Sequence, residues 1–416
     1  MRTILFGICM LFAFSVCAQR PCASSDYTTF QQSNDPSVRE QLNRVEAFIR
    51  SQQFASRMTG IEGEETIIRI PVVVHVLYNT AAQNISDAQV KSQIDALNRD
   101  FRRNNADTVN TPARFRSLAA DIKIEFALAK ADPKGRATTG IVRKQSSVKE
   151  WKMDDKIKFT AQGGDDAWDS RSYLNIWVGP MRSLLGYASY VGGPADKDGI
   201  VINTTAFGTV NVAAPYHLGR TAVHEVGHWL GLKHIWGDTY CGDDAVGDTP
   251  KQGNFTPGCP STFRSSCSNG TDGDMYMNYM DFTDDACVNL FTNGQKARML
   301  ALFNAGGPRH AILSSKGLHE PWVEEAPPAE EPQAVVPAAV RLYPNPAVSE
   351  LVLNFDTDAS WIGKSVSIVN QHGVVLMTGR VCAAAHRMNL SSLKPGMYFV
   401  LAENGEQKIR EKFIKL

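Results

Sequence analysis

The sequence has no excess charge of either sign, and it has no long apolar run beyond its first residues. Among 416 residues, Lys and Arg together number 43, and Asp and Glu together number 43, so the net charge is zero. Such a balance provides no overall field to attract nucleic acid or an anionic membrane, and no basic cluster or long internal repeat is present. No later segment has the roughly 20 apolar residues of a membrane-spanning helix. We therefore expect neither a nucleic-acid partner nor a transmembrane segment.

Cysteine is scarce as well, with eight in the whole sequence. No two cysteines have the C-x2-C spacing of common structural zinc sites, so a four-cysteine zinc site is the weaker interpretation. Four of them lie close together in the chain, at Cys241, Cys259, Cys267 and Cys287. In an oxidising export compartment this cluster is typical of two disulfides, for which the sequence alone permits three pairings.

The N-terminus has the pattern of an exported protein. Arg2 precedes an apolar run over residues 4–16, and Ala18 is a small residue before a possible cleavage point. This pattern predicts a signal peptide over residues 1–18. The alternative is a lipoprotein modified at Cys17, but Val16 stands where a small residue is expected.

The remaining chain is long enough for two or three domains. Residues 19–56 are polar, with one helical stretch over 38–51, and we interpret them as a pro-segment. Residues 57–320 form the expected catalytic domain, and residues 321–340, rich in Pro, Glu and Ala, form a linker. Residues 341–416 contain short alternating segments broken by Gly, Asn and Pro, which predicts a small all-β sandwich.

Periodicity within the catalytic domain indicates an α/β fold. A strand is predicted from Ile67, followed by a helix with a capping box formed by Ser86 and Gln89. Apolar residues at 90, 94, 97 and 101 give that helix one buried face. Further strands are expected over residues 123–129, 173–178, 185–190 and 199–202. We expect a twisted sheet that precedes and supports an active-site helix.

The most informative segment is H-E-x-x-H-x-x-G-x-x-H over residues 224–234. On a helix, His224 and His228 lie one above the other, with Glu225 beside them. Gly231 can adopt positive φ and end the helix, which lets His234 supply a third nitrogen. Three protein ligands leave a fourth position for water, as in catalytic zinc sites, with the glutamate as general base. The alternative is a buried helix that contains histidines without a metal.

Several motifs together resemble the pappalysin family of metzincin metallopeptidases. These are GRTAVHEVGHWLGLKHIWG at residues 219–237, NYMDF at residues 278–282 and the four spaced cysteines. The resemblance covers roughly residues 65–318 and implies a metzincin fold and peptide-bond hydrolysis. Met280 matches the Met-turn, whose methionine forms an apolar floor below the zinc histidines; the alternative is an ordinary core methionine. The family pairing implies the disulfides Cys241–Cys267 and Cys259–Cys287, which brace the loops around the cleft.

The same resemblance assigns three further features. Asp285 matches the acidic base of the S1′ pocket, which selects Arg or Lys at P1′; the alternative is a solvated surface acid. Phe282 stands where family members commonly carry a tyrosine, so one hydroxyl donor to the tetrahedral intermediate is missing. Asp244, Asp248 and Thr249 lie in a loop similar to the family's calcium loop, and a plain acidic turn is the alternative.

Cys22 lies near the start of the predicted secreted chain, and its thiolate is a strong zinc ligand. The resemblance implies that Cys22 occupies the water position and holds the enzyme latent. The alternatives are a disulfide with Cys382 or a free thiol. If the enzyme cuts before Arg, the bond Ser56–Arg57 is a plausible self-activation site.

The C-terminal segment, with LYPNP at residues 342–346, resembles the sorting domain of type IX secretion in Bacteroidota. This implies export through the periplasm and outer membrane of a Gram-negative bacterium, with the secretion machinery as a partner and a secreted or cell-surface product. An Ig-like adhesion module is the alternative. We therefore expect a secreted zinc endopeptidase acting on proteins and peptides, with Zn2+ and Ca2+ bound. The rival interpretations are a non-catalytic surface adhesin and a cell-wall amidase.

Overall fold

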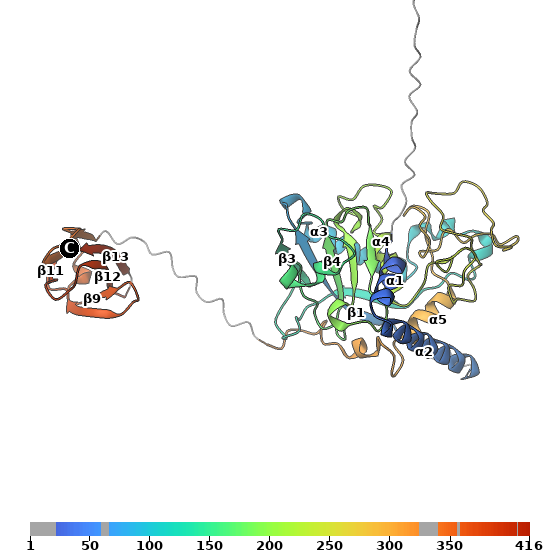
Figure 1. The fold of residues 1–416 in the computed structure, drawn as a ribbon, viewed down its shortest axis with the longest axis horizontal. Helices are drawn as coiled ribbons and strands as arrows, with labels where there is room; N and C mark the ends of the chain where they lie inside the picture. The colour runs from blue at the N-terminus through green and yellow to red at the C-terminus, as the bar shows by residue number, and fades with distance from the viewer. Residues whose placement is uncertain (1–21, 60–65, 324–339, 356–357, 406) are drawn as a thin grey trace, which may run out of the picture. The chain divides into compact units, whose positions relative to one another are not determined.

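The computed structural model describes residues 22–59, 66–323, 340–355, 358–405 and 407–416. It divides into two compact units, Met1–Glu324 and Glu325–Leu416 (Figure 1). The predicted signal peptide and most of the predicted linker lie outside the described residues. The backbone N–H groups of Trp322 and Val323 donate to the carbonyl oxygen of Gly135, so these first linker residues pack onto the first unit.

A six-stranded sheet forms the centre of the first unit. The strand order is β2-β1-β4-β6-β5, and β3 pairs with the far part of β1. The strands are β1 Ile68–Tyr78, β2 Ile124–Leu128, β3 Ile141–Gln145, β4 Leu174–Gly179, β5 Gly186–Ala188 and β6 Ile200–Asn203. The β1 pairings with β2, β3 and β4 and the β4–β6 pairing are parallel, whereas the short edge strand β5 runs antiparallel to β6. One row of the register crosses the sheet through Ile141, Val74, Ile176, Ile200 and Ala188.

The α/β expectation is confirmed, and β3 is the strand that the sequence did not predict. Its side chains are half-buried or exposed, and Arg143 and Lys144 lie in its middle, so it has no apolar face. The expected helix is α3 Asp87–Phe101, and Ser86 caps it by accepting from the N–H of Gln89 at 3.1 Å. The other half of the expected capping box is wrong, because the Gln89 side chain donates to the carbonyl oxygen of Phe207.

Two further helices of the first unit lie on either side of a long irregular segment. They are α4 Arg220–Trp229, which packs against β5 and β6, and α5 Asn293–Ala301. The residues between them form neither helix nor strand. Two disulfides, Cys241–Cys267 and Cys259–Cys287, tie this segment together with Cα separations of 5.6 and 5.7 Å. The structure therefore contains both disulfides that the family resemblance implied.

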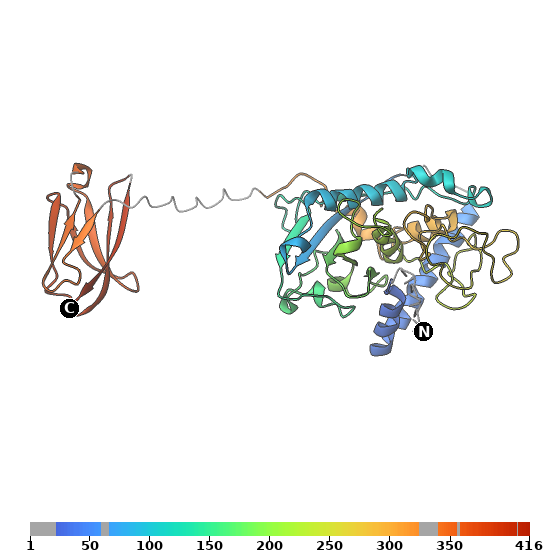
Figure 2. The same cartoon turned by 90° about the horizontal axis from the view of Figure 1, so that it is seen from above.

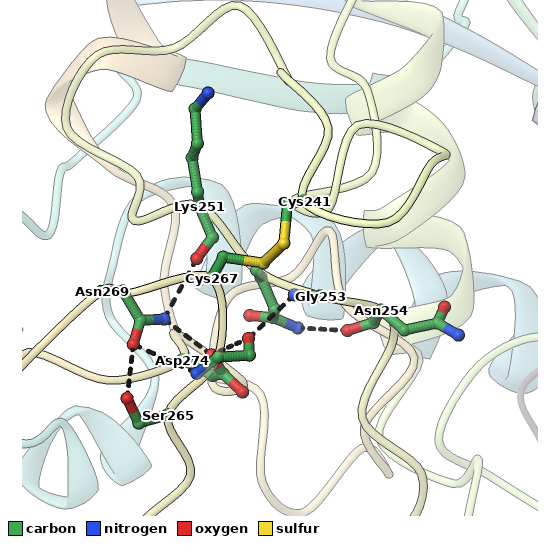
Figure 3. Close-up of a disulfide and its surroundings, with 10 residues drawn as sticks. Cys241, Lys251, Gly253, Asn254, Ser265, Cys267, Asn269 and Asp274 are labelled. Carbon is green, nitrogen blue, oxygen red and sulfur yellow. Dashed lines mark hydrogen bonds between the residues drawn. A yellow bond between two sulfur atoms is a disulfide. The ribbon is translucent and has the colours of Figure 1, made fainter.

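Hydrogen bonds reinforce the first of these disulfides (Figure 3). The Asn269 side chain donates to the carbonyl oxygen of Lys251 at 3.0 Å and to Asp274 at 2.7 Å, and the N–H of Gly253 donates to Ser266 at 2.8 Å. Local polar contacts and covalent links thus replace regular secondary structure here.

The pro-segment forms two helices, α1 Ser24–Asn34 and α2 Ser37–Thr59, drawn in blue against the rest of the first unit in Figures 1 and 2. The predicted helical stretch over residues 38–51 is confirmed within α2. The sequence did not indicate α1, whose Ser, Thr, Asp and Asn residues are weak helix formers. Tyr27 of α1 is buried beside Tyr187 at a ring-centroid distance of 5.2 Å, so tertiary packing stabilises this helix.

The second unit contains two antiparallel sheets around one core, as expected for a sandwich. Their orders are β10-β9-β12-β13 and β11-β8-β7. The strands are β7 Arg341–Tyr343, β8 Glu350–Asn354, β9 Ser365–Asn370, β10 Val375–Arg380, β11 Ala385–Asn389, β12 Gly396–Glu403 and β13 Lys408–Lys415. In the described parts of both units, no helix is long and apolar enough to cross a membrane.

Short 3-10 helices complete the two units. They are η1 Ala81–Gln83, η2 Ala106–Asn110, η3 Ala113–Phe115, η4 Lys156–Lys158, η5 Thr160–Gln162, η6 Ala195–Lys197, η7 Thr204–Ala206, η8 His310–Ser314 and η9 Ala359–Trp361.

Candidate active site and metal centre

Three imidazoles converge at the end of α4. His224 and His228 lie one helical turn apart, and the helix ends at Trp229. Gly231 then adopts a φ of 81°, which turns the chain so that His234 faces the other two rings. The Nε2 atom of His228 lies 3.1 Å from Nε2 of His224 and 3.1 Å from Nε2 of His234. The three residues that the sequence singled out therefore form one cluster.

The hydrogen bonds of the outer ring nitrogens test whether this cluster suits a metal. Nδ1 of His224 lies 2.6 Å from the carbonyl oxygen of Tyr279, and Nδ1 of His228 lies 2.9 Å from that of Leu232. Nδ1 of His234 contacts the Asp238 carboxylate. Because carbonyl and carboxylate oxygens accept, each Nδ1 carries the proton and each Nε2 directs a lone pair inward. Three such lone pairs repel one another unless a cation lies between them, so the donor set fits a metal such as Zn2+.

The protonation state of His228 agrees with this role. Burial, together with the neighbouring His234, lowers the pKa of His228 to about 3. The ring is therefore neutral at pH 7, as a metal ligand must be.

The Met-turn residue supports the helix from below. Met280 is fully buried, and its Sδ would lie 2.6 Å from a Cβ placed on Gly227. Glycine at this unspecified position of the HExxH motif leaves room for the methionine sulfur, which a Cβ there would displace. Sequence reasoning missed Gly227, and it also missed Asp238 and the Tyr279 carbonyl, because a motif records ligands and omits what orients them.

Phe282 lies beside the metal ligands. Its ring centroid is 4.8 Å from that of His234 and 4.9 Å from that of Trp236, which in turn stacks on His234 at 4.4 Å. The position is thus close to the site, and it presents a hydrocarbon edge where a tyrosine would present a hydroxyl.

Glu225 lies on the same helix, fully buried, and faces the pro-segment. The hydroxyl of Ser24 donates to Glu225 Oε2 at 2.7 Å and accepts from the N–H of Ala188 in β5 at 2.8 Å. A Cβ on Gly186 of β5 would lie 3.1 Å from Cγ of Glu225, so this glycine allows the close approach of α4 to the edge strand. Glu225 therefore lies at the boundary between the helix and the edge strand.

The first residues of the pro-segment cover the cluster. The Cys22 sulfur and the three imidazole nitrogens all lie within 4.8 Å of one another. Cys22 forms a β-bridge with Gly186, and the N–H of Ala23 donates to the Gly186 carbonyl oxygen at 3.1 Å. Cys22 and Cys382 are both free thiols in the described part of the chain.

Asp285 is fully buried, so the surface-acid alternative is wrong. Its Oδ2 accepts from the N–H groups of Leu218 at 2.9 Å and Arg220 at 3.3 Å, which places the carboxylate at the N-terminus of α4. A negative charge is favourable there because unpaired N–H groups and the helix dipole meet it. The structure thus gives Asp285 a structural contact, and its role in specificity stays a prediction.

The three proposed calcium ligands do not all meet. The Thr249 hydroxyl contacts both carboxylate oxygens of Asp244 at 2.9 and 3.0 Å. Asp248 instead accepts from Thr292 at 2.7 Å and from the N–H of Gly294 at 2.8 Å, at the start of α5. Among the described residues, the only group of at least three His, Cys, Asp or Glu side chains placed to hold a metal is Cys22 with the three histidines.

Comparisons with known proteins identify both units. Residues 159–304 match the family described as pregnancy-associated plasma protein-A, and residues 341–416 match the secretion system C-terminal sorting domain. An extracellular metalloprotease of Verticillium alfalfae is 32% identical over 58% of this chain and 78% of its own length.

Two solved structures from Tannerella forsythia are also similar. Mature mirolysin in complex with a cleaved peptide is 50% identical, with a TM-score of 0.59, over 61% of this chain and 97% of that one. The promirolysin mutant E225A is 44% identical, with a TM-score of 0.65, over 71% of this chain and 97% of that one. The histidine cluster, the Met-turn contact and these likenesses agree: the chain belongs to the pappalysin family of metzincin metalloproteases, and it is a secreted or cell-surface enzyme with a C-terminal sorting domain.

Proposed function

We propose that this chain is a zinc endopeptidase made as a latent precursor, with a preference for Arg or Lys at P1′. One observation carries the proposal: three inward-facing imidazole nitrogens lie beside a buried glutamate, and the pro-segment covers both. Zn2+ held by His224, His228 and His234 would polarise the scissile carbonyl and make water more acidic.

The chain's own groups account for the remaining chemistry. The Glu225 carboxylate accepts a proton from the attacking water and returns it to the leaving amine. The edge of β5 offers the Gly186 carbonyl and the Ala188 N–H, which the pro-segment now engages. An extended substrate can pair with the same two groups, as peptides do at exposed strand edges. The backbone groups of β5 that would orient the substrate therefore lie next to the α4 carboxylate that transfers the proton.

Latency follows from the position of Cys22. Its sulfur lies with the three histidine nitrogens and would occupy the coordination position that water needs. Ser24 adds to the block, because it takes one oxygen of Glu225 by hydrogen bonding. The proposed self-cleavage point, Ser56–Arg57, falls within the bounds of α2, and the side chains of these two residues lie outside the described part.

The first prediction concerns cleavage specificity. We expect the activated enzyme to cut a denatured proteome mainly before Arg and Lys, and to lose activity with a zinc chelator. Asp285→Asn should reduce the preference for these residues about tenfold, because a neutral amide loses the charge-assisted hydrogen bond. The amide oxygen can still accept from Leu218 and Arg220, which preserves the α4 contact. Mass spectrometry of the cleaved termini measures the preference.

Asp284→Asn is the matched control, since it removes the adjacent, partly buried carboxylate, to which we assign no role in specificity. An unchanged preference in Asp285→Asn would refute the assignment of that residue. Absence of any peptide cleavage, with zinc bound, would instead favour the adhesin interpretation. Cleavage of cell-wall amides alone would favour the amidase.

The second prediction concerns calcium. Burial raises the pKa of Asp244 to about 6, and a cation held there with Thr249 would stabilise the carboxylate. We expect Ca2+ at about 100 times its dissociation constant to raise the melting temperature by about 5 °C. Asp244→Asn should abolish this shift, whereas Asp243→Asn, at an exposed neighbour, should retain it. Equal shifts in both variants, measured by scanning calorimetry, would refute the site.

A further inference from the structure

The two pro-segment helices contact different parts of the remainder of the first unit, residues 66–323, which we call the catalytic unit. Residues at the start of α1 cover the metal ligands, whereas α2 lies beside α5 (Figure 1). A cavity of about 380 Å3 is lined by residues of both helices and by His228 near the end of α4. The two helices therefore border one cavity, but the residues of α2 that face α5 are not the ones that cover the metal ligands.

One stripe of α2 makes this contact. Gln41 lies against Gly192, Val45 and Ile49 belong to a buried apolar cluster, and the Gln52 side chain accepts from Asn304 at 2.9 Å. These positions are spaced by four, four and three residues, as expected for one face of an α-helix. The stripe ends before the proposed cleavage point.

The receiving face is formed by the catalytic unit. Val191, Ala301 and Leu302 complete the apolar cluster, and Ile49 of α2 is fully buried among them. A Cβ on Gly231 would lie 3.8 Å from Cδ1 of Ile49. Since Gly231 lies between two of the metal ligands in the sequence, α2 packs directly on the backbone of the metal-binding motif.

An ion pair adds charge specificity to this face. The guanidinium of Arg298 donates to both carboxylate oxygens of Glu46, at 3.2 and 2.5 Å, and the Arg298 side chain is only 5% exposed. Nε of Arg298 also donates to the Gly231 carbonyl oxygen at 2.8 Å. The catalytic unit itself therefore holds the guanidinium in place, with its two outer nitrogens facing α2.

The charge around Glu46 agrees with this geometry. Burial alone would raise the pKa of Glu46, but the hydrogen bonds and charges of Arg298, Arg50 and Lys233 outweigh it and lower the pKa to about 2. The carboxylate is thus charged throughout the usual pH range, and the face that receives it is positive.

We propose that one face of the catalytic unit is a binding site for an amphipathic helix, and that this face is formed by Val191, Gly231, Arg298, Ala301 and Leu302. The helix that fits it carries two apolar residues four positions apart and a carboxylate directly after the first of them. The occupant of this face is α2, which stays bound after the chain is cut. Peptide-bond cleavage and release of the pro-segment are then two separate steps of activation. The inference rests on the proposed function only in that activation includes this cleavage.

The test uses a fluorescent peptide of residues 37–56 and enzyme activated from the full chain and separated from its pro-segment. Fluorescence anisotropy should show saturable binding. Glu46→Gln in the peptide should weaken binding at least about tenfold, because Arg298 is left buried beside a neutral partner. Glu40→Gln is the matched control and should bind like the unaltered peptide. Both glutamates precede an arginine by four residues, so the two substitutions destabilise the helix of the unbound peptide by a similar amount.

Equal affinity of the two variant peptides, or no saturable binding by any of them, would overturn the proposal. Mass spectrometry confirms that each peptide is intact during the measurement. An enzyme that hydrolyses other peptides but does not bind this one would refute only this inference. An enzyme that binds it without hydrolysing any peptide would refute only the proposed function.

Discussion

Glu225→Ala is expected to abolish peptide hydrolysis while leaving the metal bound. The general base is lost, and general acid–base catalysis contributes about 10^2 to 10^4 in rate. The three imidazoles are oriented by Tyr279, Leu232 and Asp238, and the substitution leaves these three groups unchanged. The measurement is the initial rate on a quenched fluorescent peptide, with the metal content determined on the same sample.

The variant must be activated with an external protease, because self-cleavage would be lost. Glu225→Gln serves as the control for packing, since it keeps the side-chain volume and removes the basic oxygen. Both variants should therefore be inactive and hold one metal. Substantial turnover by either variant, with full metal content, would show that another group is the base.

Cys22→Ala is expected to activate the uncut precursor. The thiol lies with the three histidine nitrogens, so its removal opens the position that water needs. We expect an increase in rate of at least about 100-fold, equivalent to about 2.7 kcal/mol of lost stabilisation of the closed state. The comparison is made in a chain that also carries Arg57→Ala, so that cleavage at the proposed site cannot contribute.

Cys382→Ala is the matched control, because it removes the other free thiol described, which is exposed in the second unit. It should leave the precursor as inactive as before. A Cys22→Ala precursor that stays inactive would assign latency to the remaining contacts of α1, above all that of Ser24 with Glu225.

The sequence predicted elements whose apolar residues form a continuous run or recur with a regular period. The strand β1 is a continuous buried apolar run, and the helix α3 has apolar residues at helical spacing; both were found close to their predicted bounds. By contrast, β3 and α1 lack such a period, and pairing or packing with distant residues stabilises them. Gln89 shows the same limit, because Phe207, far along the chain, replaces the local partner that its position suggested.

The sequence by itself determined the chemistry of the metal site. The three histidines belong to one short segment, so the geometry of a single helix and of the glycine turn after it is enough to bring their rings together. Tertiary structure decided what surrounds those ligands. Only folding brings Cys22 to the histidines, Met280 to Gly227 and Glu46 to Arg298, each across many residues. These contacts depend on how the core positions whole helices and strands relative to one another. No local pattern of residues predicts those positions.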